Sequence, residues 1–150
     1  MSVQERLNTI AALSADRKNL PALAAHLKDP DPGVRLAVIE ALVALGEPTA
    51  QPLLVRSLFD EDKKIKRRCG EVLAGLGKDG IVALFERMLR SEKAWMREAA
   101  AMGMGQFSSA ALVPLLEQLA RGPDASLARH ATKSLERQAE KGNEQAVACL

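Results

Sequence analysis

The sequence predicts an all-α protein, a solenoid in which pairs of helices stack along the chain. Two observations support this fold class: apolar residues recur every 31 residues, and within each period they are spaced as on one face of a helix. The recurring residues form three columns: Leu23, Leu54, Phe85 and Leu116; Val34, Ile65, Met96 and Leu127; and Leu42, Leu73, Met104 and Leu135. Such a period is typical of units that must stack to bury their apolar faces, so we expect all three columns to be buried in one elongated domain over residues 1–150.

The first complete unit contains two predicted helices, which we call helix A and helix B. Helix A carries the apolar stripe Leu20, Leu23 and Leu27, with Pro21 in its first turn, where a missing N–H costs nothing. The segment 29–33, Asp-Pro-Asp-Pro-Gly, interrupts the chain, and Asp31 is placed to cap the next helix. Helix B carries the stripe Val34, Val38, Ala41 and Leu45, and Gly46 ends it.

The later units repeat this pattern. Their predicted helix pairs are 52–59 and 65–76, 81–90 and 94–107, and 111–121 and 125–141. The predicted repeat boundaries are 19–49, 50–80, 81–111 and 112–142. Each helix is too short to be stable alone, so its stability must come from stacking on its neighbours.

The two ends of the chain fit partial repeats. Subtracting one period from Val34, Val38 and Ala41 gives Val3, Leu7 and Ile10, which predicts a lone helix B within residues 1–18. Adding one period to Pro114 and Leu116 gives Gln145 and Val147, which predicts the start of another helix A over residues 143–150. Because that segment ends in the apolar run Ala146–Leu150, we expect it to take part in self-association.

Composition limits the possible functions. With 47% apolar and 27% charged residues, the chain has the composition of a folded, water-soluble protein, and its net charge of +2 does not by itself indicate a nucleic-acid or membrane partner. Its N-terminus is charged where a signal peptide is apolar, so we expect a cytoplasmic protein. Cys69 and Cys149 lack the spacing of a disulfide framework or a zinc site, and we expect Cys69 to be a small buried hydrophobe.

Repeated motifs give the chain a family resemblance. They are Asp31-x-x-Val34-Arg35 with Ala41-Leu42 and Leu45-Gly46; Asp62-x-x-Ile65-Lys66 with Leu73 and Leu76-Gly77; Met96-Arg97 with Ala99-Ala100; and Asp124-x-x-Leu127. Nearly the whole chain resembles the short HEAT-like repeats of bilin lyases, a type of armadillo-like solenoid. The resemblance implies a right-handed superhelix of about four and a half HEAT-like helix pairs. The chain departs from the pattern at Lys93, which is no capping acid, at Ala128, which replaces Arg, and at Gln138-Ala139, which replaces Leu-Gly.

A column of basic residues begins the B helices. It contains Arg35, Lys66 and Arg97, and it could bind an anion. The favoured interpretation is structural, because Asp31 and Asp62 recur in a matching column, and such columns resemble the Asp–Arg ladder that ties successive HEAT-like repeats together.

The sequence contains no recognisable catalytic motif. Gly103-Met-Gly105 lies within a predicted helix B with no strand before it, so close helix packing or a slight kink is a better interpretation than a dinucleotide site. His26 and His130 have no second ligand at metal-binding spacing. We therefore expect a non-enzymatic protein without a metal or cofactor.

The most informative surface, the B-helix face, lies one residue off the apolar stripe of each helix B. Its candidate partner-binding residues are Lys63, Lys64, Arg67, Arg68, Trp95, Met102, Arg129, His130, Lys133 and Arg137. Seven of these are Lys or Arg, against three acids on the same face, Glu40, Glu71 and Glu98. Basic residues around an aromatic and apolar centre are typical of a recognition surface, and solenoids bind partners on such a face.

These features predict a scaffold or adaptor that binds an acidic or extended protein along the B-helix face, with Trp95 at the centre of the contact. The first alternative is nucleic-acid binding, in which the same basic residues contact phosphates, although the three acids interrupt the basic surface. A second alternative is a bilin-lyase-like subunit or assembly chaperone, for which no chromophore pocket is evident. A third interpretation is that the basic residues are merely solvated by water and bind no partner. The family resemblance does not decide among these, because HEAT-like proteins have many functions.

Overall fold

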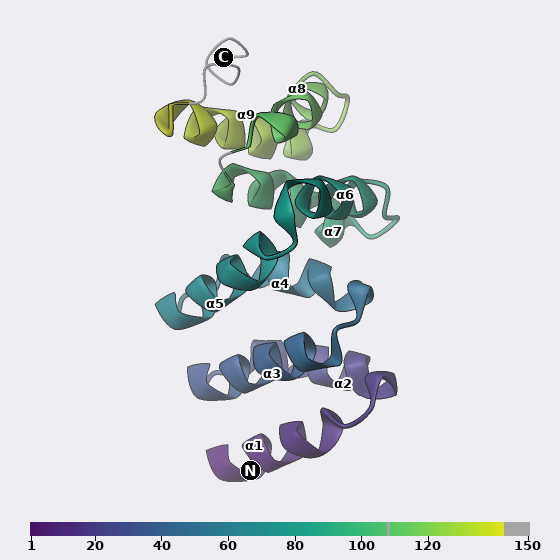
Figure 1. Ribbon diagram of the computed structural model, residues 1–150, viewed down its shortest axis with the longest axis vertical. Helices are drawn as coiled ribbons and strands as arrows, with labels where there is room; N and C mark the ends of the chain where they lie inside the picture. The colour runs from purple at the N-terminus through teal and green to yellow at the C-terminus, as the bar shows by residue number, and fades with distance from the viewer. Residues whose placement is uncertain (108, 143–150) are drawn as a thin grey trace. The chain divides into compact units, whose positions relative to one another are not determined.

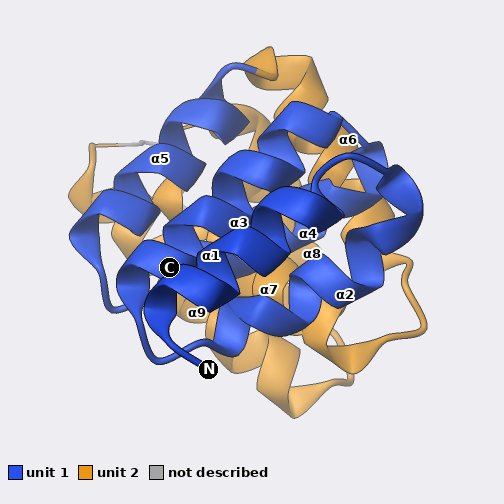
Figure 2. Ribbon diagram, turned by 90° about the horizontal axis from the view of Figure 1, so that it is seen from below, with its two compact units in different colours: residues 1–75 blue, residues 76–150 orange. Residues whose placement is uncertain are grey.

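The computed structural model describes residues 1–107 and 109–142, and within these ranges the chain forms nine α-helices joined by short turns, with no strands (Figure 1). The all-α fold of repeated helix pairs predicted from the period is thereby confirmed. The chain divides into two compact units, residues 1–75 and residues 76–150 (Figure 2).

The first unit contains five α-helices. They are α1 (Val3–Leu13), α2 (Leu20–Ala25), α3 (Pro32–Leu45), α4 (Gln51–Ser57) and α5 (Lys63–Ala74). Helices α1, α3 and α5 are the B helices, and α3 contacts both α1 and α5. Helices α2 and α4 are the A helices, each packed against the B helix that follows it, α3 and α5 respectively (Figure 1).

The second unit contains two further helix pairs. Its helices are α6 (Gly77–Leu89), α7 (Ala94–Gly103), α8 (Val113–Ala120) and α9 (Ala125–Glu140). Helix α6 packs on α7, α8 packs on α9, and α7 lies against α9. Helix α6 begins at Gly77, four residues earlier than predicted, with a positive φ of 75° that glycine adopts without strain.

The turn from helix A to helix B is built in the same way in successive repeats. Asp31, Asp62 and Asp124 each accept a hydrogen bond from the backbone N–H three residues later, as helix caps do. Lys93 has no capping side chain, yet its backbone is extended like that of the aspartates, and the Ser91 hydroxyl accepts a hydrogen bond from its N–H at 3.1 Å. The missing acid therefore leaves the third turn regular.

The three predicted apolar columns form the core, with one exception. All members of the Leu23 and Leu42 columns are buried, and so are Val34, Ile65 and Leu127. Met96 is partly exposed, so the expectation of a buried side chain at that position is wrong. Methionine is unbranched and flexible, whereas the β-branched side chains of Val34 and Ile65 are stiff and remain buried in the core.

The first helix follows a different register from the one predicted. Ser2 caps α1 and Asp31 caps α3, which sets these two helix starts 29 residues apart instead of 31. Consequently Val3, which the 31-residue period aligns with Val34, is 40% exposed, while Ile10 is buried like Ile39. The expected equivalence of Val3, Leu7 and Ile10 with the stripe of α3 is therefore wrong, because the first period is two residues shorter.

Polar side chains of α9 explain the departures from the motif at the end of the last described repeat. Ser134 donates a hydrogen bond to the carbonyl of Ala101, and the fully buried Gln138 donates to the carbonyls of Met104 and Phe107. These bonds satisfy carbonyl groups where α7 ends. Helix α9 therefore continues to Glu140, past the point where Leu-Gly closes α3.

Of the two glycines in 103–105, Gly105 serves close packing, one of the roles that the sequence indicated. Helix α7 ends at Gly103 and passes into a single 3-10 turn over Met104–Gln106. A Cβ atom on Gly105 would lie only 3.0 Å from the Cα of Ser134, so α9 approaches this turn at a distance that only glycine permits. The predicted helix over 143–150 and its proposed self-association lie outside the described residues.

Candidate partner-binding face

An Arg–Asp ladder ties the repeats of the first unit together, but its acids differ from those predicted. Arg35 makes two parallel hydrogen bonds to Asp60, from Nε at 2.9 Å and from an outer guanidinium nitrogen at 3.1 Å. Arg6 pairs with Asp29, with Nε and Oδ2 2.7 Å apart. The ladder therefore uses Asp29 and Asp60, whereas Asp31 is occupied in capping its helix. Arg35 is consequently a structural residue, as expected, and not a free anion site.

Asp29 and Asp60 each hold the turn as well as the arginine. Their carboxylates accept hydrogen bonds from the N–H groups of Asp31 and Asp62 at 2.9 and 2.8 Å. Arg35 in turn donates to the carbonyl of Asp29 at 2.7 Å. The N–H of Asp31, followed by Arg6, lowers the pKa of Asp29 below its ordinary value.

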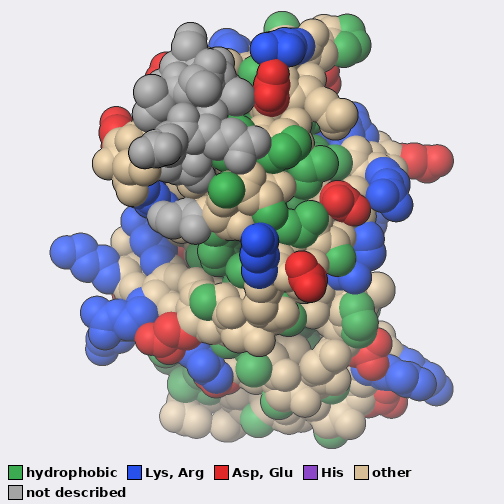
Figure 3. Space-filling model, turned by 45° about the horizontal axis from the view of Figure 1, so that its top comes forward, with side chains coloured by type: hydrophobic (Ala, Val, Ile, Leu, Met, Phe, Trp, Pro, Cys, Tyr) green, Lys and Arg blue, Asp and Glu red, His purple; other side chains and the backbone are tan. Residues whose placement is uncertain are grey.

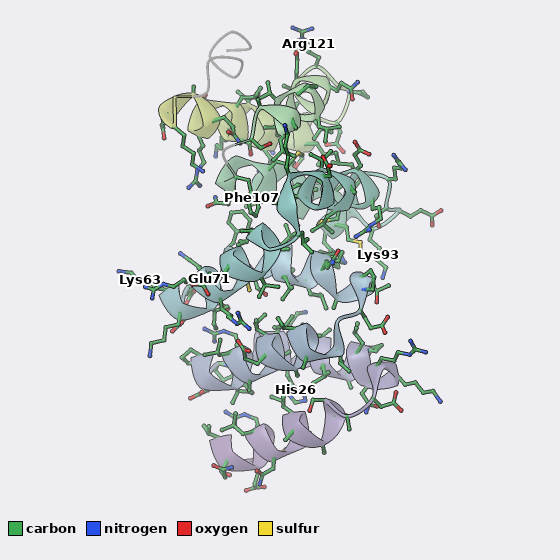
Figure 4. All side chains as sticks on the ribbon, viewed as in Figure 1. His26, Lys63, Glu71, Lys93, Phe107 and Arg121 are labelled. Atoms are coloured by element: carbon green, nitrogen blue, oxygen red, sulfur yellow. The ribbon has the colours of Figure 1, made fainter. Side chains whose placement is uncertain are left out.

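The first unit carries one part of the predicted B-helix face, on α3 and α5. Lys63, Lys64 and Arg67 are exposed and make no ion pair with the described residues, and Figure 4 shows Lys63 extending away from α5. Arg68 is partly buried and pairs with Glu40 of α3, with the closest contact at 2.5 Å. This pair, which spacing did not reveal, removes Arg68 from the set of free cations.

The second unit carries the other part of this face, on α7 and α9. Arg129, Lys133 and Arg137 are exposed and follow one another at intervals of four residues, so they lie along one side of α9. They make no ion pair with the described residues. The hydroxyl of Ser126 approaches Glu98 of α7 at 3.5 Å, which shows that the two helices adjoin on this side. Lys and Arg side chains project from the surface drawn in Figure 3, with Asp and Glu among them.

The apolar part of this face lies on α7. Trp95 and Met102 are both partly exposed and are seven residues apart, so they lie on the same side of the helix. Trp95 is not buried in the core. Burial in the core would have excluded its ring from contact with a partner. His130 on α9 is also partly exposed.

Lys141, the C-cap residue of α9, follows the basic row of this helix. Its ammonium group donates to the carbonyl of Gly105 at 3.1 Å. Burial lowers the pKa of Lys141, and the positive charge of Arg137 lowers it further. Lys141 thus contributes to holding α9 against the end of α7.

The remaining candidate groups have structural environments. Cys69 is fully buried, and burial raises the pKa of its thiol to about 12, so it is a small hydrophobe as expected. His26 is partly exposed. Among the described residues, no three His, Cys, Asp or Glu side chains come together as metal ligands, and no helix is long and apolar enough to cross a membrane.

A groove between the A helices of the second unit was not anticipated from the sequence. It lies between α6 and α8 and has a volume of about 540 Å³. Its lining includes the leucines Leu89, Leu115 and Leu119 together with the charged residues Glu86, Arg90 and Asp124. A smaller groove of about 160 Å³ occupies the equivalent place between α2 and α4 in the first unit. The residue that could have revealed the larger groove is Gly122, which occupies the position that Asp60 has two repeats earlier.

Comparison with known proteins agrees with the geometry of the repeats. The family model of HEAT repeats matches residues 2–62 and residues 56–136. These matches together cover most of the chain. No curated protein matches the sequence.

Proposed function

The chain belongs to the HEAT repeat family, and we propose that it is a non-enzymatic scaffold or adaptor that binds an acidic protein segment along the B-helix face. The observation that carries this proposal is the surface of the second unit, where α9, with its exposed cations, packs on α7, with its partly exposed Trp95 and Met102. HEAT repeats generally serve as protein-interaction scaffolds, and this surface has the composition of a recognition site.

Each part of the surface has a distinct proposed role. Trp95 and Met102 supply the apolar contact, because a partly buried aromatic loses little conformational freedom when a partner covers it. Arg129, Lys133 and Arg137 attract the acidic segment and set its orientation. The first unit carries a basic patch of its own, formed by Lys63, Lys64 and Arg67, to which Arg68 contributes less because Glu40 already neutralises it.

A titration with a labelled peptide tests this proposal. The probe is a ten-residue peptide that alternates glutamate with leucine, and the control peptide has glutamine in place of glutamate. We expect the acidic peptide to bind more tightly than the control, and Trp95→Ala to weaken its binding at every salt concentration. Lys133→Glu combined with Arg137→Glu is expected to weaken binding chiefly at low salt, since exposed charges are screened by ions. Equal binding of the two peptides by the wild-type protein would contradict the proposal.

Nucleic-acid binding is the second candidate, favoured by the row of cations on α9, which form no ion pair within the described part of the chain. Phosphate contacts would make the affinity for a 20-base-pair duplex fall log-linearly with salt, and Trp95→Ala would have little effect on it. The same variants therefore separate the two candidates. Glu71 and Glu98 interrupt the basic surface in the two units, which favours a protein partner.

A further inference from the structure

The groove between α6 and α8 lacks a carboxylate at the position that Asp60 occupies in its counterpart in the first unit. The two grooves occupy equivalent repeat positions, so that Leu89 corresponds to Leu27, Leu119 to Ser57 and Gly122 to Asp60. In the first unit the Asp60 side chain lines the groove and binds Arg35. In the second unit Gly122 has no side chain, and the groove is larger.

The arginine that would meet this carboxylate is still present. Arg97 is the repeat equivalent of Arg35, and it is held in the same way, because each donates to the carbonyl six residues earlier at 2.7 Å. In Arg35 the remaining guanidinium N–H groups bind Asp60. From the equivalence of the repeats, we expect those of Arg97 to face the place of the absent side chain at Gly122. Arg97 is partly buried and makes no ion pair with the described residues.

The two acids that line the groove, Asp124 and Glu86, are already engaged. Asp124 caps α9 by accepting a hydrogen bond from the N–H of Leu127 at 3.1 Å, and Glu86 lies 3.6 Å from Arg90. Arg121, which precedes Gly122, pairs with Glu117 of α8 at 2.7 Å. None of these groups takes the role that Asp60 has for Arg35.

We propose that this groove binds a short acidic peptide segment, whose carboxylate takes the place of the missing side chain at Gly122 and pairs with Arg97. The apolar neighbours of that carboxylate lie against Leu89, Leu115 and Leu119. The partner thus completes the Arg–Asp ladder that the protein completes by itself in the first unit. This site lies on the A-helix side of the second unit, and it does not rest on the proposed B-helix face.

A paired set of peptides and variants tests the site. The probes are acetyl-Leu-Asp-Leu-amide and acetyl-Leu-Asn-Leu-amide, each titrated into the ¹⁵N-labelled full chain and followed by NMR. We expect the aspartate peptide to shift the amide signals of Leu119 and Gly122 and the Nε–H signal of Arg97. The asparagine peptide, which cannot form the ion pair, is expected to bind about tenfold more weakly.

Two variants remove the site in different ways. Gly122→Asp supplies the carboxylate within the chain, so it should weaken binding of the aspartate peptide about tenfold and raise the melting temperature of the protein. A Cβ at residue 122 lies close to the carbonyls of Gln118 and Leu119, at 3.3 and 3.4 Å, and Gly122→Asn measures the cost of that contact. Arg97→Gln should lower the affinity for the aspartate peptide to that for the asparagine peptide. This variant tests the site independently if Gly122→Asp fails to fold.

Several results would overturn the inference. One is equal affinity of the two peptides, and another is unchanged binding of the aspartate peptide by Arg97→Gln. A third is the absence of shifts at a peptide concentration of about 10 mM, because a dissociation constant above that value is very weak even for so small a ligand. Lys78→Glu on α6 is the matched control, because Lys78 is exposed and lies outside both the groove lining and the B-helix face, and it should leave the titration unchanged. Loss of peptide binding in that variant would show that the peptide responds to overall charge and not to Arg97, which would contradict the groove.

Discussion

Arg35 and Asp60 form a two-pronged ion pair that joins consecutive repeats, and both side chains are largely buried, at 14% and 13% exposure. Guanidinium and carboxylate groups in this geometry form strong charge-assisted hydrogen bonds, and the loss of one partner leaves the other desolvated. This pair therefore identifies the turn between helix A and helix B as a point at which the stack of the first unit is held together.

Asp60→Asn is expected to lower the free energy of unfolding by about 2–3 kcal/mol, because it leaves Arg35 without its counter-charge. Arg17→Gln is the control, since Arg17 pairs with Glu47 at the surface and is 75% exposed, and its loss should cost under about 1 kcal/mol. Urea denaturation of the two variants measures both values. Equal losses of stability in the two variants would show that the buried ion pair contributes no more than the exposed one.

The ion pair of Asp29 should make stability depend on acidity. Because the folded-state pKa of Asp29 lies below its ordinary value of 3.8, its contribution is complete above that value and is lost as the pH falls through the lower, folded-state pKa. Asp29→Asn should therefore flatten the loss of stability in acid. Melting temperatures recorded from pH 6 down to about pH 3 test this, and parallel curves for the variant and the wild type would contradict it.

Ile65→Ala should destabilise the protein by about 2–5 kcal/mol, because it removes a side chain that is only 1% exposed. Met96→Ala, at the equivalent position one repeat later, should cost less, since Met96 is partly exposed. Thermal unfolding followed by circular dichroism compares the two variants. A silent Ile65→Ala change would be inconsistent with the 31-residue register.

Two glycines should respond to alanine with opposite signs. Gly105→Ala forces a Cβ against Ser134 at 3.0 Å and is expected to be destabilising, because the contact is with backbone that cannot move freely. Gly70 lies inside α5, and a Cβ there would meet only Leu58 at an ordinary 3.9 Å. Gly70→Ala should therefore stabilise the protein by about 0.5–1 kcal/mol. Denaturation midpoints of both variants test this prediction, and it is contradicted if Gly105→Ala is the more stable of the two.

The sequence predicted those features that repeat strictly. The apolar columns and the three capping aspartates follow from period and spacing alone, since burial and capping depend on local position. The register of α1 could not be predicted, because a first period shorter by two residues leaves apolar residues at Val3 and Leu7 that imitate the pattern. The identity of the ladder acids was also hidden, since Asp29 and Asp31 recur with the same period and only the structure distinguishes the ion pair from the cap.

The candidate site was predictable to a smaller extent. Helical spacing placed Arg129, Lys133 and Arg137 on one side of α9, where they lie. Spacing within one helix could not show that Arg68 meets Glu40, because that contact joins two helices. The groove beside Gly122 depends on a side chain that is missing, and the absence of a residue has meaning only when the contact made by its equivalent is known.

The emission of Trp95, the one tryptophan of the chain, tests the proposed binding face most directly. The measurement is the emission spectrum during titration with the glutamate–leucine peptide. We predict a shift to shorter wavelength as the peptide covers the partly exposed ring, and no shift in the Arg129→Glu, Lys133→Glu, Arg137→Glu triple variant. Binding of the peptide with an unchanged Trp95 spectrum would contradict the account, because the partner would then lie elsewhere on the protein.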